Sequence, residues 1–282
     1  MTKDVIKSDG ARAAIYRDAP RWDGMKTASI GDFRCEDAET GAALLRQITE
    51  TVATEGFSAV IGPMNGNTWN SYRLVSESDG RSPFLMEPTS NSHDAEAFKQ
   101  AGFDTIGRYF SASASVADTL ATLPQADDRI EVTTWDGTKP EEHFSNVYDL
   151  SIKAFSDNAF YTPISREVFL EMYMPFVPLL RKELILLARD SATGELVGFL
   201  FGIPNFQEGQ APESVILKTY ASLQPGAGRA LSKAFHQAAH DLGFKTAIHA
   251  LIHDDNDSAE RSRMHGATVF RRYDLMGLRI DG

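Results

Sequence analysis

The fold is decided by the stretch Ser214-Val-Ile-Leu-Lys-Thr-Tyr-Ala-Ser-Leu-Gln-Pro-Gly-Ala-Gly-Arg-Ala230. Its first eight residues are rich in the branched and aromatic side chains of a strand, and residues 223–228 have the composition of a turn. From Gly228 to Leu242 apolar residues recur every three or four positions, which predicts an amphipathic helix. Gly243 is a fitting end for that helix. The sequence therefore predicts a strand, a glycine-rich turn and a helix in direct succession.

Strands and helices alternate on both sides of this stretch. Downstream, residues 246–252 and 268–276 are predicted strands, and residues 258–265 form a short polar helix between them. The upstream elements are a strand, two helices and a hairpin, predicted in that order at residues 129–136, 141–155, 165–180, 184–189 and 196–203. Such alternation predicts an α/β or α+β protein.

The first part of the chain repeats the strand–helix–strand order. Residues 26–33 and 58–61 are predicted strands, and residues 41–55 form an amphipathic helix between them. One constant offset along the chain pairs Gly41 with Gly228, Ala43 with Ala230, Leu44 with Leu231, Gly56 with Gly243 and Ile61 with Ile248. We therefore predict a duplication, although two generic units could be alike by chance. The duplication implies an insertion near residues 73–92 and a connecting segment at residues 111–128.

Residues 129–280 resemble the GNAT superfamily of acyl-CoA-dependent N-acyltransferases in the order of their elements. The first half resembles a truncated copy of that fold, so the chain is similar to tandem-GNAT proteins. The stretch from Ile61 to Arg73 resembles a bacterial N-acetyltransferase-like subgroup. The resemblance implies a degenerate GNAT-like domain at residues 1–115 and a GNAT N-acyltransferase domain at residues 129–282. The expected fold class is thus α/β (α+β), with the complete GNAT fold in the second half.

The glycine-rich turn is the candidate site for acetyl-CoA or another acyl-CoA. A pyrophosphate needs several converging backbone N–H groups, and a helix N-terminus preceded by small residues provides them. The resemblance implies cofactor contacts from Ala221, Leu223, Gly226, Ala227, Gly228, Arg229, Ala230 and Asn256. A glycine-rich connection without a ligand is the alternative. In the first copy the corresponding turn, residues 36–41, is acidic and would repel a pyrophosphate.

Direct acyl transfer requires a deprotonated amine and often an acid for the leaving thiolate. The family often places a tyrosine seven residues after the asparagine, but this sequence has Arg263 there. Glu213 and His249 are the candidate bases, and Tyr220 is a substitute acid. Each of the three could equally be an ordinary pocket or surface residue. A GNAT-fold protein that binds CoA or another ligand without transfer is therefore the alternative function.

Three aromatic residues are candidates for the wall of a substrate pocket. Phe160, Tyr161 and Tyr173 lie near the two helices that precede the hairpin, and the resemblance places the acceptor site there. Core packing is the other interpretation of these residues. The expected acceptor is the primary amine of a small molecule.

Composition excludes several other classes. The net charge of −11 argues against nucleic acid as a partner. The absence of an 18-residue apolar run argues against a membrane span, and the single Cys35 indicates a cytoplasmic location without disulfides. His236 and His240 have the spacing of metal ligands but lie off the apolar stripe, so we predict that both face solvent and that no metal is bound.

Overall fold

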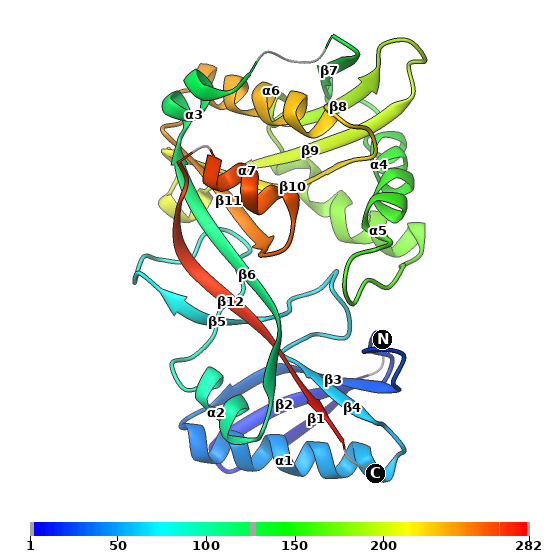
Figure 1. Cartoon of the computed structure of the whole chain (residues 1–282), viewed down its shortest axis with the longest axis vertical. Helices are drawn as coiled ribbons and strands as arrows, with labels where there is room; N and C mark the ends of the chain where they lie inside the picture. The colour runs from blue at the N-terminus through cyan, green and yellow to red at the C-terminus, as the bar shows by residue number, and fades with distance from the viewer. Residues whose placement is uncertain (1–2, 125–127, 265, 281–282) are drawn as a thin grey trace. The chain divides into compact units, whose positions relative to one another are not determined.

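The structure, a computed structural model, describes residues 3–124, 128–264 and 266–280 (Figure 1). Contacts divide the chain into two compact units. Unit 1 comprises Met1–Phe110, Ala159–Thr162 and Arg271–Gly282, and unit 2 comprises Ser111–Asn158 and Pro163–Phe270. The units interleave along the chain, whereas the sequence predicted two consecutive domains. The strands β6 and β12 each contribute residues to both units.

Unit 1 is a sheet with the strand order β1–β2–β3–β4–β12–β6, and β5 also pairs with β12. The strands are β1 (Lys3–Ser8), β2 (Ala11–Tyr16), β3 (Thr27–Cys35), β4 (Ala59–Gly62), β5 (Leu74–Ser78), β6 (Asp104–Ser115) and β12 (Thr268–Arg279). Its helices are α1 (Ala38–Thr54) and α2 (Asp94–Gln100). Figure 1 shows α1 lying along the sheet formed by β1 to β4.

The predicted amphipathic helix of the first copy is α1. Its buried side chains include Leu44, Leu45, Ile48 and Val52, the four that the sequence placed on one side. Cys35 is buried in the same core, and burial, together with Asp94, raises the pKa of its thiol to about 12. Cys35 is thus a packed core residue, as the sequence indicated.

Unit 2 has the strand order β6–β11–β10–β9–β8–β7. Its other strands are β7 (Ile130–Thr134), β8 (Ile185–Asp190), β9 (Leu196–Pro204), β10 (Ser214–Ser222) and β11 (Thr246–His253). The helices are α3 (Val116–Thr122), α4 (Pro140–Phe155), α5 (Arg166–Tyr173), α6 (Ala227–Asp241) and α7 (Asp257–Met264), and the 3-10 turns are Met174–Leu179, Lys182–Leu184 and Phe206–Glu208.

The sequence of β9 shows why α4 and α6 cover opposite faces of the unit 2 sheet. Phe201 lies 5.6 Å from Phe144 of α4, measured between ring centroids. On the other face, a Cβ atom at Gly202 would lie 2.5 Å from the ring of Phe235 in α6. Neighbouring side chains of a strand point to opposite faces, so the small residues of β9 let α6 approach closely.

The two strand–helix–strand units have the same topology and register. β3 and β4 are parallel and pair Thr27 with Ala59, and β10 and β11 are parallel and pair Ser214 with Thr246. These two pairs are related by the same constant offset that the sequence predicted. A bulge also interrupts β10 at Lys218 and β3 near Asp32. The pairing geometry therefore agrees with the predicted repeat.

Two sequence interpretations were wrong. Residues 111–128 are more than a connection, because residues 111–115 complete β6 and residues 116–122 form α3; residues 125–127 lie outside the described part.

His236 is fully buried, whereas His240 is exposed as predicted. The buried face of α6 is wider than its apolar stripe because it also includes His236, whose ring lies 5.8 Å from that of His249 on β11. His236 is accommodated there by a 2.8 Å hydrogen bond between its Nδ1 and the carbonyl of Ser232.

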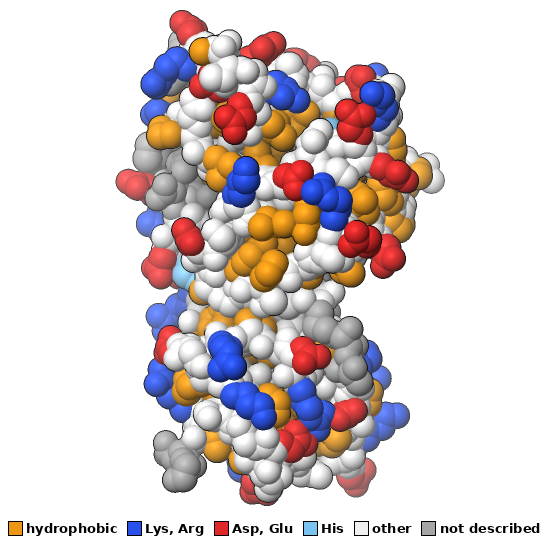
Figure 2. All heavy atoms as spheres, turned by 90° about the vertical axis from the view of Figure 1, so that its right-hand side faces the viewer, with side chains coloured by type: hydrophobic (Ala, Val, Ile, Leu, Met, Phe, Trp, Pro, Cys, Tyr) orange, Lys and Arg blue, Asp and Glu red, His pale blue; other side chains and the backbone are white. Residues whose placement is uncertain are grey.

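The described residues contain no helix that is both long and apolar enough to cross a membrane. Acidic and basic side chains are interspersed on the face shown in Figure 2.

Candidate functional site

The candidate site of unit 2 begins where β10 and β11 separate. Within the described residues, β10 and β11 pair in parallel from Ser214, which lies opposite Thr246, to Leu217, which lies opposite His249. Both strands continue beyond it, β10 to Ser222 and β11 to His253. The bulge at Lys218 coincides with the end of this pairing. Backbone groups on the facing edges beyond that point can therefore pair with an extended ligand instead of with the neighbouring strand.

The second component is the N-terminus of α6, which follows β10 after a short turn. Its N-cap is Gly226 with a φ of 96°, a conformation that favours glycine. No side chain caps this helix among the described residues. The helix dipole makes that end attractive to an anion. The N–H groups of Ala227 and Arg229 already donate, at 3.2 and 3.1 Å, to the carbonyls of Gln224 and Gly226. The turn can thus attract a phosphate through its dipole, and the phosphate would compete with these hydrogen bonds for the backbone donors.

The predicted cofactor residues contribute to this end in different ways. Ala221, Ala227, Gly228 and Ala230 are buried, and the backbone N–H groups of Ala227 and Ala230 donate to the carbonyls of Gln224 and Gly226. These residues thus bring no exposed side chain to the turn. Arg229 is exposed and can add a positive charge. Leu223 donates its backbone N–H to the carbonyl of Val197 at 2.8 Å. Leu223 therefore has only its carbonyl and its exposed side chain to offer.

Asn256 lies in the turn that precedes α7. It is exposed, and its carbonyl accepts a hydrogen bond of 2.7 Å from the N–H of Ala259. The backbone of Asn256 thus helps to begin α7, and its side chain takes no part in that hydrogen bond. Contact of Asn256 with the pantetheine arm remains a prediction.

His249 stands at the point of strand separation, because it is the last residue of β11 paired with β10. Its side chain is buried, and its Nδ1 lies 2.9 Å from the Oγ of Ser262 on α7. The ring of His236 lies 5.8 Å from its own ring, at nearly a right angle. The sequence did not indicate this cluster, because its three members lie on α6, β11 and α7.

Tyr220 lies on β10 beyond the bulge and also reaches α7. Its hydroxyl is 2.7 Å from the Oγ of Ser258, and either oxygen can be the donor. Tyr220 is partly buried against the unit 2 core. The hydroxyl of Tyr220 thus belongs to the separated part of β10 and is held by α7.

The structure does not bring Glu213 to this site. Glu213 precedes β10, at the opposite end of that strand from the glycine turn, and forms an exposed ion pair with Lys245. Eight residues of strand separate it from Ala221, which corresponds to roughly 26 Å. As placed here, Glu213 does not fit the role of a base beside the turn.

The predicted substrate residues are divided between the two units. Tyr173 packs against Phe144 and Phe169, at centroid distances of 5.8 and 4.5 Å, and burial raises its pKa to about 12. These contacts favour the core-packing interpretation for Tyr173. Phe160 and Tyr161 group with unit 1, where the ring of Tyr161 lies 6.0 Å from that of Trp69.

The corresponding helix start in unit 1 is closed by its own side chain. The N-cap of α1 is Asp37, whose carboxylate accepts a 2.8 Å hydrogen bond from the N–H of Thr40. This carboxylate occupies the position where a phosphate would bind and adds a negative charge. The geometry is therefore consistent with the predicted structural role of the first copy.

No metal-ligating group of three or more His, Cys, Asp or Glu side chains occurs within the described residues. No family model matches the sequence, and no curated protein matches it. Solved structures do match the fold over nearly the whole chain.

A GCN5-related N-acetyltransferase from Sphaerobacter thermophilus is similar with a TM-score of 0.59 and 15% identity, over 97% of this chain and 78% of that one. A tandem GNAT protein from the clavulanic acid biosynthesis pathway is similar with a TM-score of 0.56 and 15% identity, over 99% and 82%. A GCN5-related N-acetyltransferase from Anabaena variabilis has a TM-score of 0.56 and 9% identity, over 98% and 62%. The chain thus has the GNAT fold over nearly its whole length, as the sequence predicted.

Proposed function

We propose that unit 2 is an acyl-CoA-dependent N-acyltransferase, which transfers an acyl group, in the first instance acetyl, to the primary amine of a small molecule. The observation that carries the proposal is the order of features along one strand. β10 parts from β11 after Leu217, and it then leads into the glycine N-cap of α6. An acyl-CoA bound in an extended conformation needs both a strand-like edge for the amide groups of its pantetheine arm and an anion site for its pyrophosphate. Unit 2 offers these two features in succession.

The proposed reaction is direct. The neutral amine nitrogen attacks the thioester carbonyl carbon, the C–S bond breaks, and the amine proton leaves while the thiolate of CoA gains one. Tyr220 is the proposed proton donor to the thiolate, because its hydroxyl lies beyond the bulge and shares a hydrogen bond with Ser258. His249 is the proposed acceptor of the amine proton, because it stands where the strands part. No role is proposed for Glu213.

A second candidate function is ligand binding without transfer. It is favoured by the burial of His249, which holds its Nδ1 against Ser262. It is also favoured by Arg263 at the position where the family often has tyrosine. In this alternative CoA or a similar ligand binds to the same turn, but no thioester is cleaved.

The deciding experiment is calorimetric titration of CoA into the wild-type chain and Gly228→Asp. The new carboxylate would stand in the first turn of α6 and oppose the phosphate charge. Loss of one charge-assisted hydrogen bond costs about 1.5–3 kcal/mol, so we expect binding to weaken at least about tenfold. Gln237→Glu is the matched control, because it adds the same charge to an exposed position further along the same helix.

Unchanged affinity in Gly228→Asp, or equal loss in Gln237→Glu, would contradict the assignment of the turn. Thermal unfolding of both variants shows whether each is folded at the titration temperature. Thioester cleavage with a panel of primary amines then separates the two candidate functions. Binding of CoA without cleavage would favour the non-catalytic one.

A further inference from the structure

Unit 1 contains a pocket at the place that corresponds to the strand separation of unit 2. Twelve residues line it, and they come from the end of β3, the segment after β4, the insertion between β4 and α2, and the start of α2. The constant offset between the two copies relates Asp32, at the edge of this pocket, to Thr219 beside the bulge of β10. The pocket is therefore the first copy's counterpart of the proposed acyl site.

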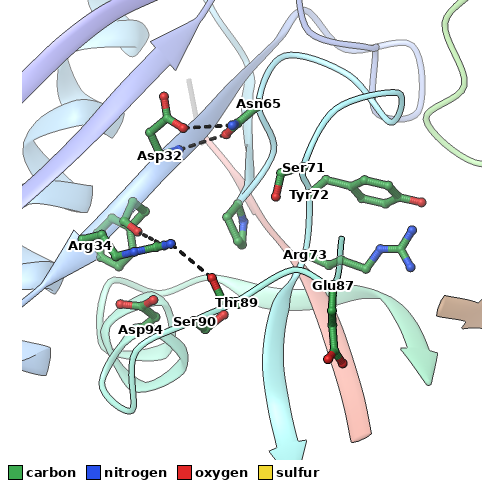
Figure 3. Close-up of a pocket in the computed structure, with 12 residues that line it drawn as sticks. Asp32, Arg34, Asn65, Ser71, Tyr72, Arg73, Glu87, Thr89, Ser90 and Asp94 are labelled. Atoms are coloured by element: carbon green, nitrogen blue, oxygen red, sulfur yellow. Dashed lines mark hydrogen bonds between the residues drawn. The ribbon is translucent and has the colours of Figure 1, made fainter. Parts of the chain in front are cut away.

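A side chain of unit 1 occupies the bulge where a ligand carbonyl would bind. The N–H of Asp32 donates to the Oδ1 of Asn65 at 2.9 Å, and the Nδ2 of Asn65 donates back to the carboxylate of Asp32 at 2.9 Å (Figure 3). A Cβ atom at Gly31 would lie only 2.2 Å from this Oδ1. The Asn65 amide thus takes the hydrogen bond that a thioester carbonyl would need. Together with the Asp37 cap, it makes unit 1 unsuited to acyl-CoA.

The space that remains is small and polar. Its volume is about 130 Å³, which is enough for several water molecules. Figure 3 shows Arg34 directed toward Thr89, with Ser90 and Asp94 beside them, while Arg73 and Tyr72 extend away from this group. Hydroxyl groups of Ser71, Thr89 and Ser90 also belong to the lining. A ligand of about five non-hydrogen atoms fits such a space.

The charges around the pocket favour an anion. The carboxylate of Asp32 is paired with Lys3 at 2.8 Å, and that of Glu87 with Arg271. Burial raises the pKa of Asp94, while the charge of Arg34 opposes that rise. Arg34 donates to the carbonyl of Phe33 and, at 3.5 Å, to Thr89, and within the described residues it forms no ion pair. Since a guanidinium has five N–H donors, Arg34 keeps donors for a ligand.

We infer that this pocket binds a small carboxylate with a hydroxyl or amino group next to the carboxyl carbon. The carboxylate pairs with the guanidinium of Arg34, in the geometry that favours such pairs. The neighbouring polar group bonds to the hydroxyl of Thr89 or Ser90 or to the carboxyl of Asp94. The inference is independent of the function proposed for unit 2, because every lining residue belongs to unit 1.

The test is a nuclear magnetic resonance titration of the full chain with glycolate, observed at the Nε–Hε groups of arginine. We expect a saturable shift at Arg34 with a dissociation constant on the order of 1 mM, which suits a ligand of five heavy atoms. Glycolamide has nearly the same shape but no charge, so it should bind at least about tenfold more weakly. Glycine in place of glycolate shows whether the pocket prefers an amino or a hydroxyl group.

Arg34→Gln should weaken glycolate binding at least about tenfold, because a charge-assisted hydrogen bond is lost. Since this variant lacks the Arg34 signal, binding is compared between variants at the backbone amides of Thr89 and Ser90, which line the pocket. Arg46→Gln is the matched control, since Arg46 is an exposed arginine of α1 that does not line the pocket. The inference is overturned if neither glycolate nor glycine shifts Arg34. It is also overturned if glycolamide binds as tightly as glycolate, or if Arg34→Gln binds as the wild type does. Addition of CoA should leave the titration unchanged, so failure of CoA binding in unit 2 would not affect this result.

Discussion

Glu87 is the residue whose change should most clearly destabilise unit 1. Its buried carboxylate pairs with Arg271, accepts a hydrogen bond from the Tyr273 hydroxyl, and accepts another of 2.9 Å from the N–H of Phe84. Arg271 and Tyr273 lie on β12, whereas Glu87 lies in the insertion that the sequence predicted near residues 73–92. The interactions therefore hold this insertion against β12.

Glu87→Gln preserves the shape of the side chain but removes its charge. The side chains of Glu87 and Arg271 are 0% and 5% exposed, so the variant removes the buried carboxylate charge that pairs directly with Arg271. Breaking a buried pair in this way costs about 3–5 kcal/mol. The neighbouring pair of Arg272 with Glu77 also joins β12 to β5, but its side chains are 42% and 73% exposed. Glu77→Gln is thus the matched control, with an expected cost below about 1 kcal/mol.

Urea unfolding of the full chain, followed by tryptophan fluorescence, measures both free energies. Trp22 and Trp69 belong to unit 1 and report its transition. Replacing Glu87 and Arg271 together by Met should recover much of the stability lost in Glu87→Gln, because no unpaired charge remains. The reasoning is refuted if Glu87→Gln costs no more than Glu77→Gln.

Two further predictions concern unit 2. Burial lowers the pKa of His143 from 6.5 to about 4. Between pH 6.5 and pH 4, His143 is therefore protonated in the unfolded chain but neutral in the folded one. The stability that is present above pH 6.5 is lost as the pH falls toward 4. We expect a loss of about 2 kcal/mol between pH 7 and pH 5, measured by urea unfolding, and an equal loss in His143→Phe would contradict this. Tyr220→Phe should lower acyl-transfer turnover by about 100-fold or more while CoA affinity is preserved, as steady-state kinetics and calorimetry would show. The control is Tyr148→Phe, which removes a hydroxyl bonded to the carbonyl of Ile164 in the same unit and should leave turnover unchanged. If the turnover of Tyr220→Phe equals that of the wild type, Tyr220 is not the acid.

Local sequence signals predicted much of the fold. The apolar stripe and flanking glycines of α6 gave its bounds to within a residue or two, because helix periodicity and end residues are local properties. The constant offset between the two copies anticipated the shared register of β3–β4 and β10–β11. By contrast, β1 was missed, because its residues are mostly exposed and show no alternation of apolar and polar side chains.

The site was less predictable, since it depends on which strand ends and side chains meet. The sequence proposed the glycine turn, His249 and Tyr220 as site residues, but it could not show that Glu213 pairs with Lys245 or that His236 packs against His249. It also gave no sign that Asn65 would close the bulge of β3 or that Arg34 would line a pocket. Helix periods, turns and repeats are determined by neighbours along the chain, so the sequence alone determined them. Strand pairing, burial and the meeting of distant side chains arise from contacts across the sheet, and these only the tertiary structure decided.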